Sequence, residues 1–207
     1  MKVLMLNGSP HQFGCTYTAL QSVADALRAE NIATEVIWCG DKPMQDCVQC
    51  HACAKLGRCI YDNDIVNEVI EKSKLADGFV FGAPVHYAHP GGRILSVLDR
   101  IFCAGAKHLT YKPGAAVVSA RRAGTTAALD VLNKYFTINK MPIVSSHYWN
   151  IVHGRTPEEA QKDAEGVQTL KILGRNMAWL IKGIALAKQN GIREPDDVAR
   201  QNTNFIR

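Results

Sequence analysis

Four cysteines within one short segment are the most distinctive chemical feature of this 207-residue sequence. They stand at Cys47, Cys50, Cys53 and Cys59, in a Cys-x2-Cys-x2-Cys-x5-Cys spacing. Thiolates this close along the chain can converge on one iron–sulfur cluster. Structural zinc sites more often use two separated Cys-x2-Cys pairs, and thiols that hold no metal are the third interpretation. The spacing therefore favours an iron–sulfur cluster over zinc or an empty thiol loop.

A second candidate site is the loop 7–16, Asn-Gly-Ser-Pro-His-Gln-Phe-Gly-Cys-Thr, which leads directly into a predicted helix. Gly8 and Gly14 permit tight turns, and the free N–H groups at the start of a helix attract phosphate. The loop has neither the Gly-Lys-Ser/Thr of a triphosphate-binding loop nor the Gly-x-Gly-x-x-Gly of a dinucleotide-binding fold. We therefore predict a phosphate site of another kind, with an ordinary polar strand-to-helix turn as the alternative.

Short apolar runs alternate with helical stripes along the chain, and these elements must position the two loops. Such alternation predicts an α/β domain with a buried parallel sheet, in which ligands bind beyond the carboxyl ends of the strands. The aperiodic segment 39–63 is predicted to be a long functional loop. Strands are predicted at 2–7, 34–38, 78–82, 115–119 and 142–145, and helices from 16, over 64–75, 91–102 and 125–136, with a long last helix from about Pro157.

Composition and charge narrow the class of protein. Apolar residues make up 47% and charged residues 21%, which is ordinary for a globular chain and excludes wholesale disorder. The net charge of +5 is concentrated in segment 91–122, where six Lys or Arg residues accompany one Asp. A nucleic-acid binder would show a longer basic stripe with interleaved aromatic residues. We therefore expect no nucleic-acid partner, and a local site for a phosphorylated small molecule.

The start of the chain is too quickly interrupted to be a signal peptide, and no apolar run approaches the roughly 20 residues of a membrane span. We therefore expect a cytoplasmic protein with no membrane partner. In that reducing compartment the seven cysteines are not expected to form a disulfide framework. Cys39 and Cys103, outside the cluster, are interpreted as buried small hydrophobic residues.

Three motifs together resemble a known family. Asn7-Gly-Ser-Pro10, Ala83-Pro-Val-His-Tyr87 and Gly91-Gly-Arg-Ile-Leu-Ser-Val-Leu-Asp-Arg100 occur in order, at or after predicted strand ends. The sequence is similar in this respect to the flavodoxin-like NADPH-dependent FMN reductase family, and in particular to its iron–sulfur flavoprotein branch. The resemblance covers roughly residues 1–154 and continues more loosely through the last helix. It implies a flavodoxin-like, doubly wound, five-stranded parallel sheet with a long cysteine-bearing loop after strand two and a long C-terminal helix.

The resemblance also implies a set of cofactors and the residues that hold them. FMN would bind with its phosphate on the Gly-Ser-Pro loop and its ring against the Pro-x-x-Tyr loop. Cys15 departs from the family pattern, which more often has Asn there. The iron–sulfur branch implies that Cys47, Cys50, Cys53 and Cys59 ligate a [4Fe-4S] cluster. The predicted FMN-binding residues are Ser9, Pro10, His11, Cys15, Thr16, Pro84, Val85, His86, Tyr87, Ser119, Arg121, Arg122 and Gly124.

The activity implied by the resemblance is that of an FMN-dependent oxidoreductase. NAD(P)H would reduce the FMN, which passes electrons to a quinone, a nitro or azo compound, free flavin or the cluster. Because hydride transfer is the cofactor's chemistry, no side chain is expected to be an indispensable acid or base. The alternatives are an electron-transfer protein linked to a ferredoxin-like partner, without a small-molecule substrate, and a non-catalytic module that binds a phosphorylated ligand.

The resemblance bears on assembly and domain boundaries as well. A flavodoxin-like sheet leaves the flavin edge open, and relatives close it with a neighbouring subunit. We therefore expect a homodimer or homotetramer, with Tyr148, Trp149 and the last helix offering the apolar contact surface. Residues 1–190 are assigned to one FMN-binding domain, and 191–207 to a polar C-terminal tail.

Overall fold

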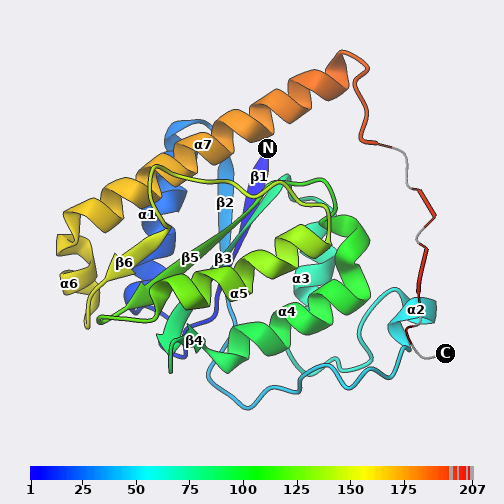
Figure 1. Ribbon diagram of the computed structural model, residues 1–207, viewed down its shortest axis with the longest axis horizontal. Coiled ribbons are helices and arrows are strands. Elements are labelled where there is room, and N and C mark those ends of the chain that lie inside the picture. Colours follow the sequence, from blue (N-terminus) through cyan, green and yellow to red (C-terminus); the bar gives the residue numbers. More distant parts are fainter. Residues whose placement is uncertain (196–197, 200, 204, 206–207) are drawn as a thin grey trace.

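The computed structural model describes residues 1–195, 198–199, 201–203 and 205. Within these residues, five parallel strands form one sheet in the order β2-β1-β3-β5-β6 (Figure 1). A two-residue strand, β4, pairs antiparallel with the end of β3. The strands are β1 (Lys2–Asn7), β2 (Ala33–Trp38), β3 (Gly78–His86), β4 (His89–Pro90), β5 (Gly114–Ala120) and β6 (Ile151–His153).

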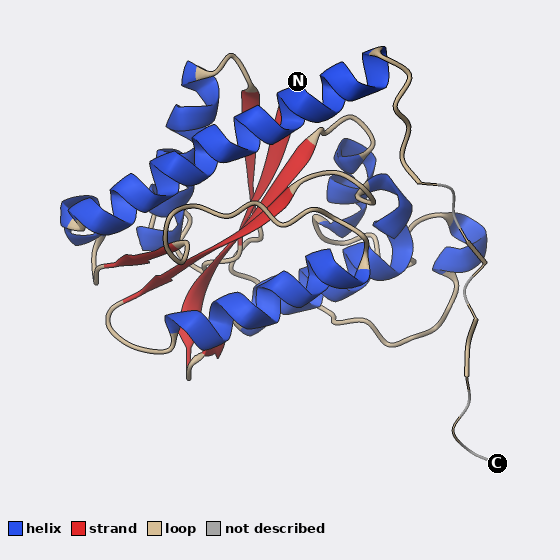
Figure 2. Cartoon of the chain, turned by 45° about the horizontal axis from the view of Figure 1, so that its top comes forward, coloured by secondary structure: helices blue, strands red, loops and turns tan. Residues whose placement is uncertain are grey.

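Helices cover both faces of this sheet. Figures 1 and 2 show α1 and α7 on one side and α3, α4 and α5 on the other. The helices are α1 (Cys15–Ala29), α2 (Cys53–Leu56), α3 (Val66–Ser73), α4 (Gly92–Gly105), α5 (Thr125–Ile138), α6 (Pro157–Lys162) and α7 (Ala164–Gln189), with a 3-10 turn η1 at Ala106–His108. The predicted doubly wound, five-stranded parallel sheet is confirmed.

The two layers of the core follow from the alternation of side chains along each strand. In β1, Val3 and Met5 pack with α1 and α7, whereas Leu4 and Leu6 pack with α3, α4 and α5. Residues 3–6 are all buried, as expected for a parallel strand covered on both faces. This packing fixes the strand ends, and hence the loops that follow them.

The predicted strand at 142–145 is wrong, because the fifth strand is β6, at 151–153. Ile143 makes only an isolated bridge to Gly114, at the start of β5. Pro142 has no N–H with which to extend such a ladder. The chain then leaves the sheet and returns at the other end of β5, where Val118 pairs with Ile151. The loop after the fifth strand is therefore the segment that follows His153.

The predicted long helix from Pro157 is in fact two helices. Pro157 does begin a helix, α6, but this helix ends at Lys162. Asp163 has a non-helical ψ of 81°, and its carboxylate accepts a hydrogen bond from the N–H of Gly166, so that it caps α7. No helix in the described part of the chain is long and apolar enough to cross a membrane. The predicted tail 191–207 lies partly outside the described residues.

Candidate functional site

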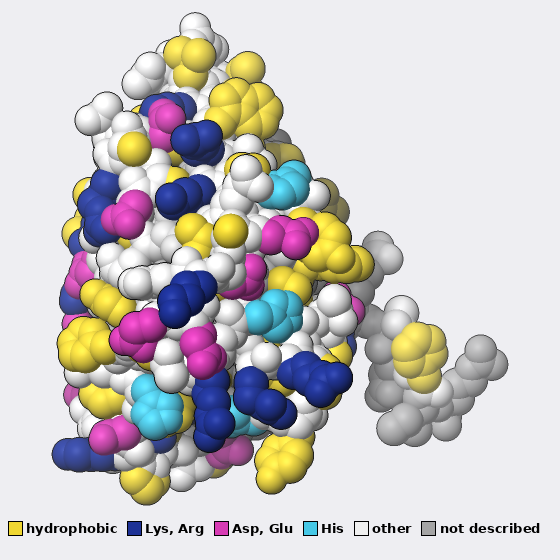
Figure 3. Space-filling model, turned by 90° about the vertical axis from the view of Figure 1, so that its left-hand side faces the viewer, with side chains coloured by type: hydrophobic (Ala, Val, Ile, Leu, Met, Phe, Trp, Pro, Cys, Tyr) yellow, Lys and Arg dark blue, Asp and Glu magenta, His cyan; other side chains and the backbone are white. Residues whose placement is uncertain are grey.

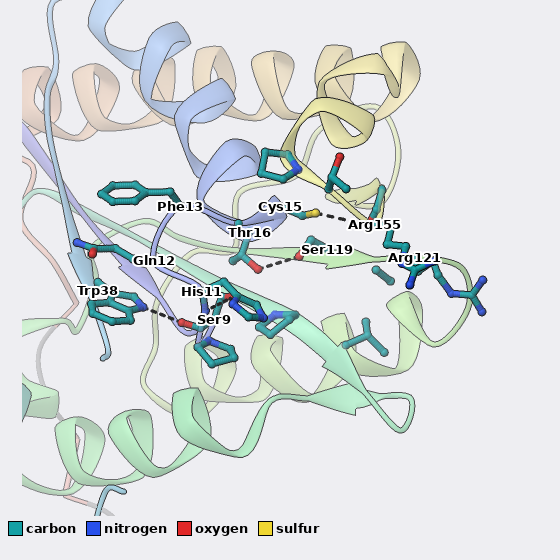
Figure 4. Close-up of a pocket in the computed structure, with 18 residues that line it drawn as sticks. Ser9, His11, Gln12, Phe13, Cys15, Thr16, Trp38, Ser119, Arg121 and Arg155 are labelled. Carbon is teal, nitrogen blue, oxygen red and sulfur yellow. Dashed lines mark hydrogen bonds between the residues drawn. The ribbon is translucent and has the colours of Figure 1, made fainter. Parts of the chain in front are cut away.

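A cavity of about 650 Å³ opens at the carboxyl ends of the strands (Figure 4). The loops after β1, β5 and β6 contribute to this main cavity, together with residues near the ends of β2, β3 and β5. The sequence argument placed the functional residues at these strand ends, and the structure brings most of them together. Nine of the thirteen predicted FMN-binding residues line the cavity: Ser9, Pro10, His11, Cys15, Thr16, Pro84, Val85, Ser119 and Arg121.

The loop after β1 is held in shape by its own polar groups. The buried Asn7 carboxamide accepts a hydrogen bond from the N–H of Ser9 at 3.1 Å and donates one to the carbonyl of Gln12 at 2.8 Å. The Ser9 hydroxyl accepts a hydrogen bond from the N–H of His11 at 3.1 Å. Gly8 passes so close to α4 that an added Cβ would lie 2.5 Å from the Cβ of Ile94. This packing requires glycine at position 8.

The start of α1 provides hydrogen-bond donors to the cavity. Among the described residues no side chain caps this helix, and the first N–H groups of a helix have no intrahelical acceptor. Thr16, in the first turn, lies 2.8 Å from the Ser119 hydroxyl, and both side chains are buried. An uncapped helix start beside two hydroxyl groups suits a phosphate monoester. The residues present therefore fit the phosphate of FMN.

Cys15 joins two of the loops around the cavity. Its thiol donates a hydrogen bond to the carbonyl of Gly154, which follows β6, with an Sγ···O distance of 3.5 Å. Burial raises the pKa of this thiol above its ordinary value. The residue that departs from the family pattern therefore links the loop after β1 to the loop after β6.

Trp38 and Arg155 are among the residues of the main cavity that were not predicted from the sequence. Trp38 ends β2, and its indole N–H donates to the carbonyl of Ser9 at 2.8 Å. Arg155 follows β6 and lies with Arg121 at the end of the site away from Trp38 (Figure 4). The strand-end rule identifies Trp38 when it is applied to β2. It could not identify Arg155, because the fifth strand had been placed at 142–145.

Four predicted FMN-binding residues do not line the main cavity. His86 and Tyr87 lie in the hairpin between β3 and β4, where the Tyr87 side chain is fully exposed. Gly124 has a φ of +90° and packs against this hairpin, since an added Cβ would lie 2.6 Å from the Cα of Ala88. Arg122 is exposed. On the side of the molecule that carries α6, Lys and Arg side chains gather in the lower part of the view (Figure 3).

Residues 39–63, called here the cysteine segment, form a second, separate cavity together with α4, called here the cysteine cavity. Among the residues that line it are Cys47, Cys50, Cys53 and Cys59. Cys103, on α4, lines it as well and is exposed, so its interpretation as a buried hydrophobic residue is wrong. The same interpretation of Cys39 is confirmed.

The donor atoms of the cysteine cavity are of a kind that suits a thiophilic metal, but they are not arranged around one point. Five thiols open onto it, and thiolates are the normal ligands of iron–sulfur clusters. Within the described residues, however, no group of three or more His, Cys, Asp or Glu side chains is arranged to hold a metal ion. The cysteine cavity therefore offers thiol donors without an arranged metal site among the described residues.

Comparisons with known proteins agree with this geometry. The family model for NADPH-dependent FMN reductase matches residues 1–156. An iron–sulfur flavoprotein of Methanocaldococcus jannaschii is 30% identical over 190 residues, which cover 88% of this chain and 98% of that protein. An iron–sulfur flavoprotein of Methanosarcina thermophila is 26% identical over 188 residues, which cover 88% and 96% of the two chains.

A solved structure shows the same fold at low sequence identity. RosB with bound 8-demethyl-8-formylriboflavin-5'-phosphate superposes with a TM-score of 0.71 at 15% identity, covering 100% of this chain and 92% of that one. A flavodoxin from the domain Archaea superposes with a TM-score of 0.59 at 15% identity, covering 88% of this chain and 99% of that one. This second likeness, together with the strand order, makes the fold flavodoxin-like.

Proposed function

The chain belongs to the NADPH-dependent FMN reductase family, and from this premise we propose that it is an oxidoreductase whose bound FMN is reduced by NAD(P)H. The observation that carries the proposal is the main cavity, where the uncapped start of α1 meets the hydroxyls of Thr16 and Ser119. The family and the iron–sulfur flavoprotein relatives support a flavoprotein oxidoreductase. The identity of the electron donor, NAD(P)H, and that of the electron acceptor belong to the proposal.

In the proposed site, Ser9, Thr16 and the first N–H groups of α1 bind the FMN phosphate. Pro84 and Val85, at the end of β3, border the space for the flavin ring. When bound, FMN supplies hydride and single-electron chemistry, and the chain binds and orients it. The proposal also keeps four residues at the border of the site: His86, Tyr87, Arg122 and Gly124. They lie in or near the β3–β4 hairpin, which also contains Val85, a residue that lines the cavity.

Arg121 and Arg155 are proposed to attract the phosphates of the nicotinamide donor. Both line the main cavity at the end away from Trp38, and both are exposed to solvent. A cationic rim of this kind raises the local concentration of an anionic substrate and speeds its association. This proposal replaces Arg122 by Arg155 as the main partner of Arg121, since Arg122 does not line the cavity.

The cysteine segment is proposed to hold a [4Fe-4S] cluster on Cys47, Cys50, Cys53 and Cys59. When bound, the cluster supplies one-electron transfer to or from a partner. The relatives named iron–sulfur flavoproteins support this assignment, as does the gathering of the thiols around one cavity. The exposure of Cys50 gives specific support to the second candidate function, exchange of electrons with a ferredoxin-like protein at this surface.

A homodimer or homotetramer is proposed on the basis of exposed aromatic side chains. Tyr148 and Trp149 are each about half exposed, and their rings meet edge to face at a centroid distance of 4.7 Å. Exposed aromatic pairs are typical of the centres of protein interfaces. Residues 1–190 are proposed to act as one FMN-binding domain.

The choice between the two functions is tested by the electron donor. Full-length protein, purified without oxygen and loaded with FMN, is mixed with NADPH, NADH or a reduced ferredoxin, and the flavin absorbance is followed. Bleaching by a reduced nicotinamide, followed by recovery when a quinone or nitro compound is added, supports the oxidoreductase. Bleaching by the ferredoxin alone supports the electron-transfer protein. A chain that retains no flavin contradicts both.

A further inference from the structure

The largest fully buried side chain in the described part of the molecule carries a charge. Arg100, on α4, is 1% exposed. A guanidinium removed from water costs several kcal/mol unless its donors are satisfied and its charge is compensated. An apolar residue at this position of α4 would avoid that cost. The partners of Arg100 therefore indicate what the buried charge does.

Every recorded hydrogen-bond partner of Arg100 belongs to the cysteine segment or to the residues just after it. Nη1 donates to the Asp64 carboxylate and to the carbonyl of Gln45, the latter at 3.1 Å. Nη2 donates to the carbonyl of Tyr61 at 2.9 Å, and the guanidinium also lies over the ring of Tyr61. Nε donates to Sγ of Cys59 at 3.3 Å. One side chain thus ties both ends of the segment to α4.

Cys59 is the cysteine that this arrangement holds most firmly. The side-chain amide of Asn67 accepts a hydrogen bond from the Cys59 N–H at 2.9 Å and donates one to the Cys59 carbonyl at 3.0 Å. Asn67 therefore fixes the backbone of Cys59, while Arg100 fixes its sulfur. A lysine could not replace Arg100, because an ammonium group lacks the planar fork that reaches four acceptors in different directions.

We propose that Arg100 is a positioning residue of the cysteine site, which holds Cys59 in place for a bound metal and stabilises the negative charge on its sulfur. The inference rests on the part of the proposed function that assigns a metal to these cysteines. Partners that orient a metal ligand typically change metal affinity 10- to 100-fold when they are removed. Hydrogen bonds to cluster sulfurs and nearby positive charge also raise the reduction potential, because they stabilise the more negative, reduced form.

The first test measures metal binding by the full-length protein, reduced and freed of metal, with Co²⁺ as the probe. The thiolate-to-Co²⁺ charge-transfer band reports thiolate coordination directly. Arg100→Gln is expected to weaken Co²⁺ binding by about 10-fold or more, and Arg100→Lys, which keeps the charge, to recover part of the loss. Arg58→Gln is the matched control, because Arg58 lies in the same segment but is exposed and pairs with Asp62. An unchanged Co²⁺ affinity in Arg100→Gln overturns the proposal.

The second test is made on the parent protein. A variant is needed only to assign the resonance. The Nε–H of Arg100 is followed by NMR in parent protein labelled with ¹⁵N-arginine, before and after addition of Cd²⁺. A metal-bound Cys59 thiolate is a stronger acceptor than the thiol, so this resonance is expected to move downfield, while that of Arg58 stays in place. A resonance that does not respond to bound Cd²⁺ assigns Arg100 a purely structural role and overturns the proposal.

A separate measurement distinguishes failure of this inference from failure of the proposed function. If the parent binds neither Co²⁺ nor Cd²⁺ through its thiols, the inference is wrong. FMN binding and its reduction by NAD(P)H are read from the flavin spectrum and do not depend on that result. In protein that does take up iron and sulfide, the cluster in Arg100→Gln, which removes the charge, is expected to have a lower reduction potential than the parent's, and an equal potential contradicts the electrostatic part of the proposal.

Discussion

The hydroxyl oxygens of Thr16 and Ser119 lie 2.8 Å apart, although 103 residues separate them in the sequence. Thr16 belongs to the first turn of α1, and Ser119 to the end of β5. Both side chains are buried, and both line the main cavity. This hydrogen bond links the loop after β1 to the strand on the far side of β3. The start of α1 and the end of β5, which belong to strands that are not neighbours in the sheet, thereby meet in the proposed phosphate site.

Replacing Ser9 and Thr16 together by Val is expected to weaken FMN binding by about 10-fold or more, because charge-assisted hydrogen bonds contribute about 1.5–3 kcal/mol each. The measurement is a titration of flavin fluorescence. Thr18→Val is the control, since the Thr18 hydroxyl bonds to the Gly14 carbonyl and does not line the cavity. Unchanged FMN affinity in the double variant would contradict the phosphate assignment.

Replacing Arg121 and Arg155 together by Ala is expected to raise the KM for NADPH by about fivefold or more at low salt, because the cationic rim of the cavity is lost. The difference between parent and variant should shrink as salt is added, since screening weakens the parent's attraction. Arg122→Ala is the control, because Arg122 is exposed but lies outside the cavity. If Arg122→Ala has the larger effect, the donor binds elsewhere.

Gly8→Ala is expected to destabilise the protein by about 1–3 kcal/mol, the usual cost of an overpacked contact. The added Cβ would lie 2.5 Å from the Ile94 Cβ and 3.0 Å from the Gly82 carbonyl oxygen. Gly92→Ala is the matched control, since an added Cβ there meets nothing within 4 Å. Urea unfolding measures both variants, and equal midpoints for Gly8→Ala and the parent would show that the loop packs differently.

In metal-free protein at pH 8, Cys39 is expected to resist alkylation while the exposed Cys50 reacts. Burial raises the pKa of the Cys39 thiol to about 12, so its nucleophilic thiolate becomes abundant only as the pH approaches that value. Mass spectrometry of the digested protein gives the extent of modification at each cysteine, and urea-unfolded protein is the control. Cys39 labelling as fast as Cys50 in the folded chain would contradict the buried position.

The parent protein is expected to be at least a dimer at micromolar concentration in light scattering. Replacing Tyr148 and Trp149 together by Ser should shift it toward the monomer, because aromatic anchors carry much of the energy of an interface. Leu75→Ser, at an exposed apolar residue elsewhere, is the control. A monomeric parent, or a double variant with unchanged mass, would exclude this pair as the contact.

The predicted site residues that line the main cavity come from short segments with their own local signals. The loop 7–16 combines a buried strand, glycines and a helix start within ten residues, so its role depends little on the rest of the fold. Pro84 was found because it lies just after the predicted strand at 78–82, and Ser119 because it ends the predicted strand at 115–119. The parallel sheet then brings those strand ends together.

The parts that were missed depend on distant packing. Arg155 enters the cavity only because the fifth strand pairs at 151–153, and the apolar run at 142–145 concealed that pairing. Cys103 has the sequence context of a core residue on an amphipathic helix. Only the packing of segment 39–63 over α4 shows that Cys103 lines the cysteine cavity. The partners of Arg100 lie 36 to 55 residues away, beyond the reach of any helical or strand period.

The comparison of FMN with riboflavin tests the central claim most directly, because the two ligands share the flavin ring and differ only in the phosphate. Flavin-free, full-length protein is titrated with each under identical conditions. A phosphate held by the start of α1, Ser9 and Thr16 predicts that FMN binds at least about 100-fold more tightly than riboflavin, since several charge-assisted hydrogen bonds are lost with the phosphate. Equal affinities for FMN and riboflavin would contradict the phosphate site and, with it, the proposed function.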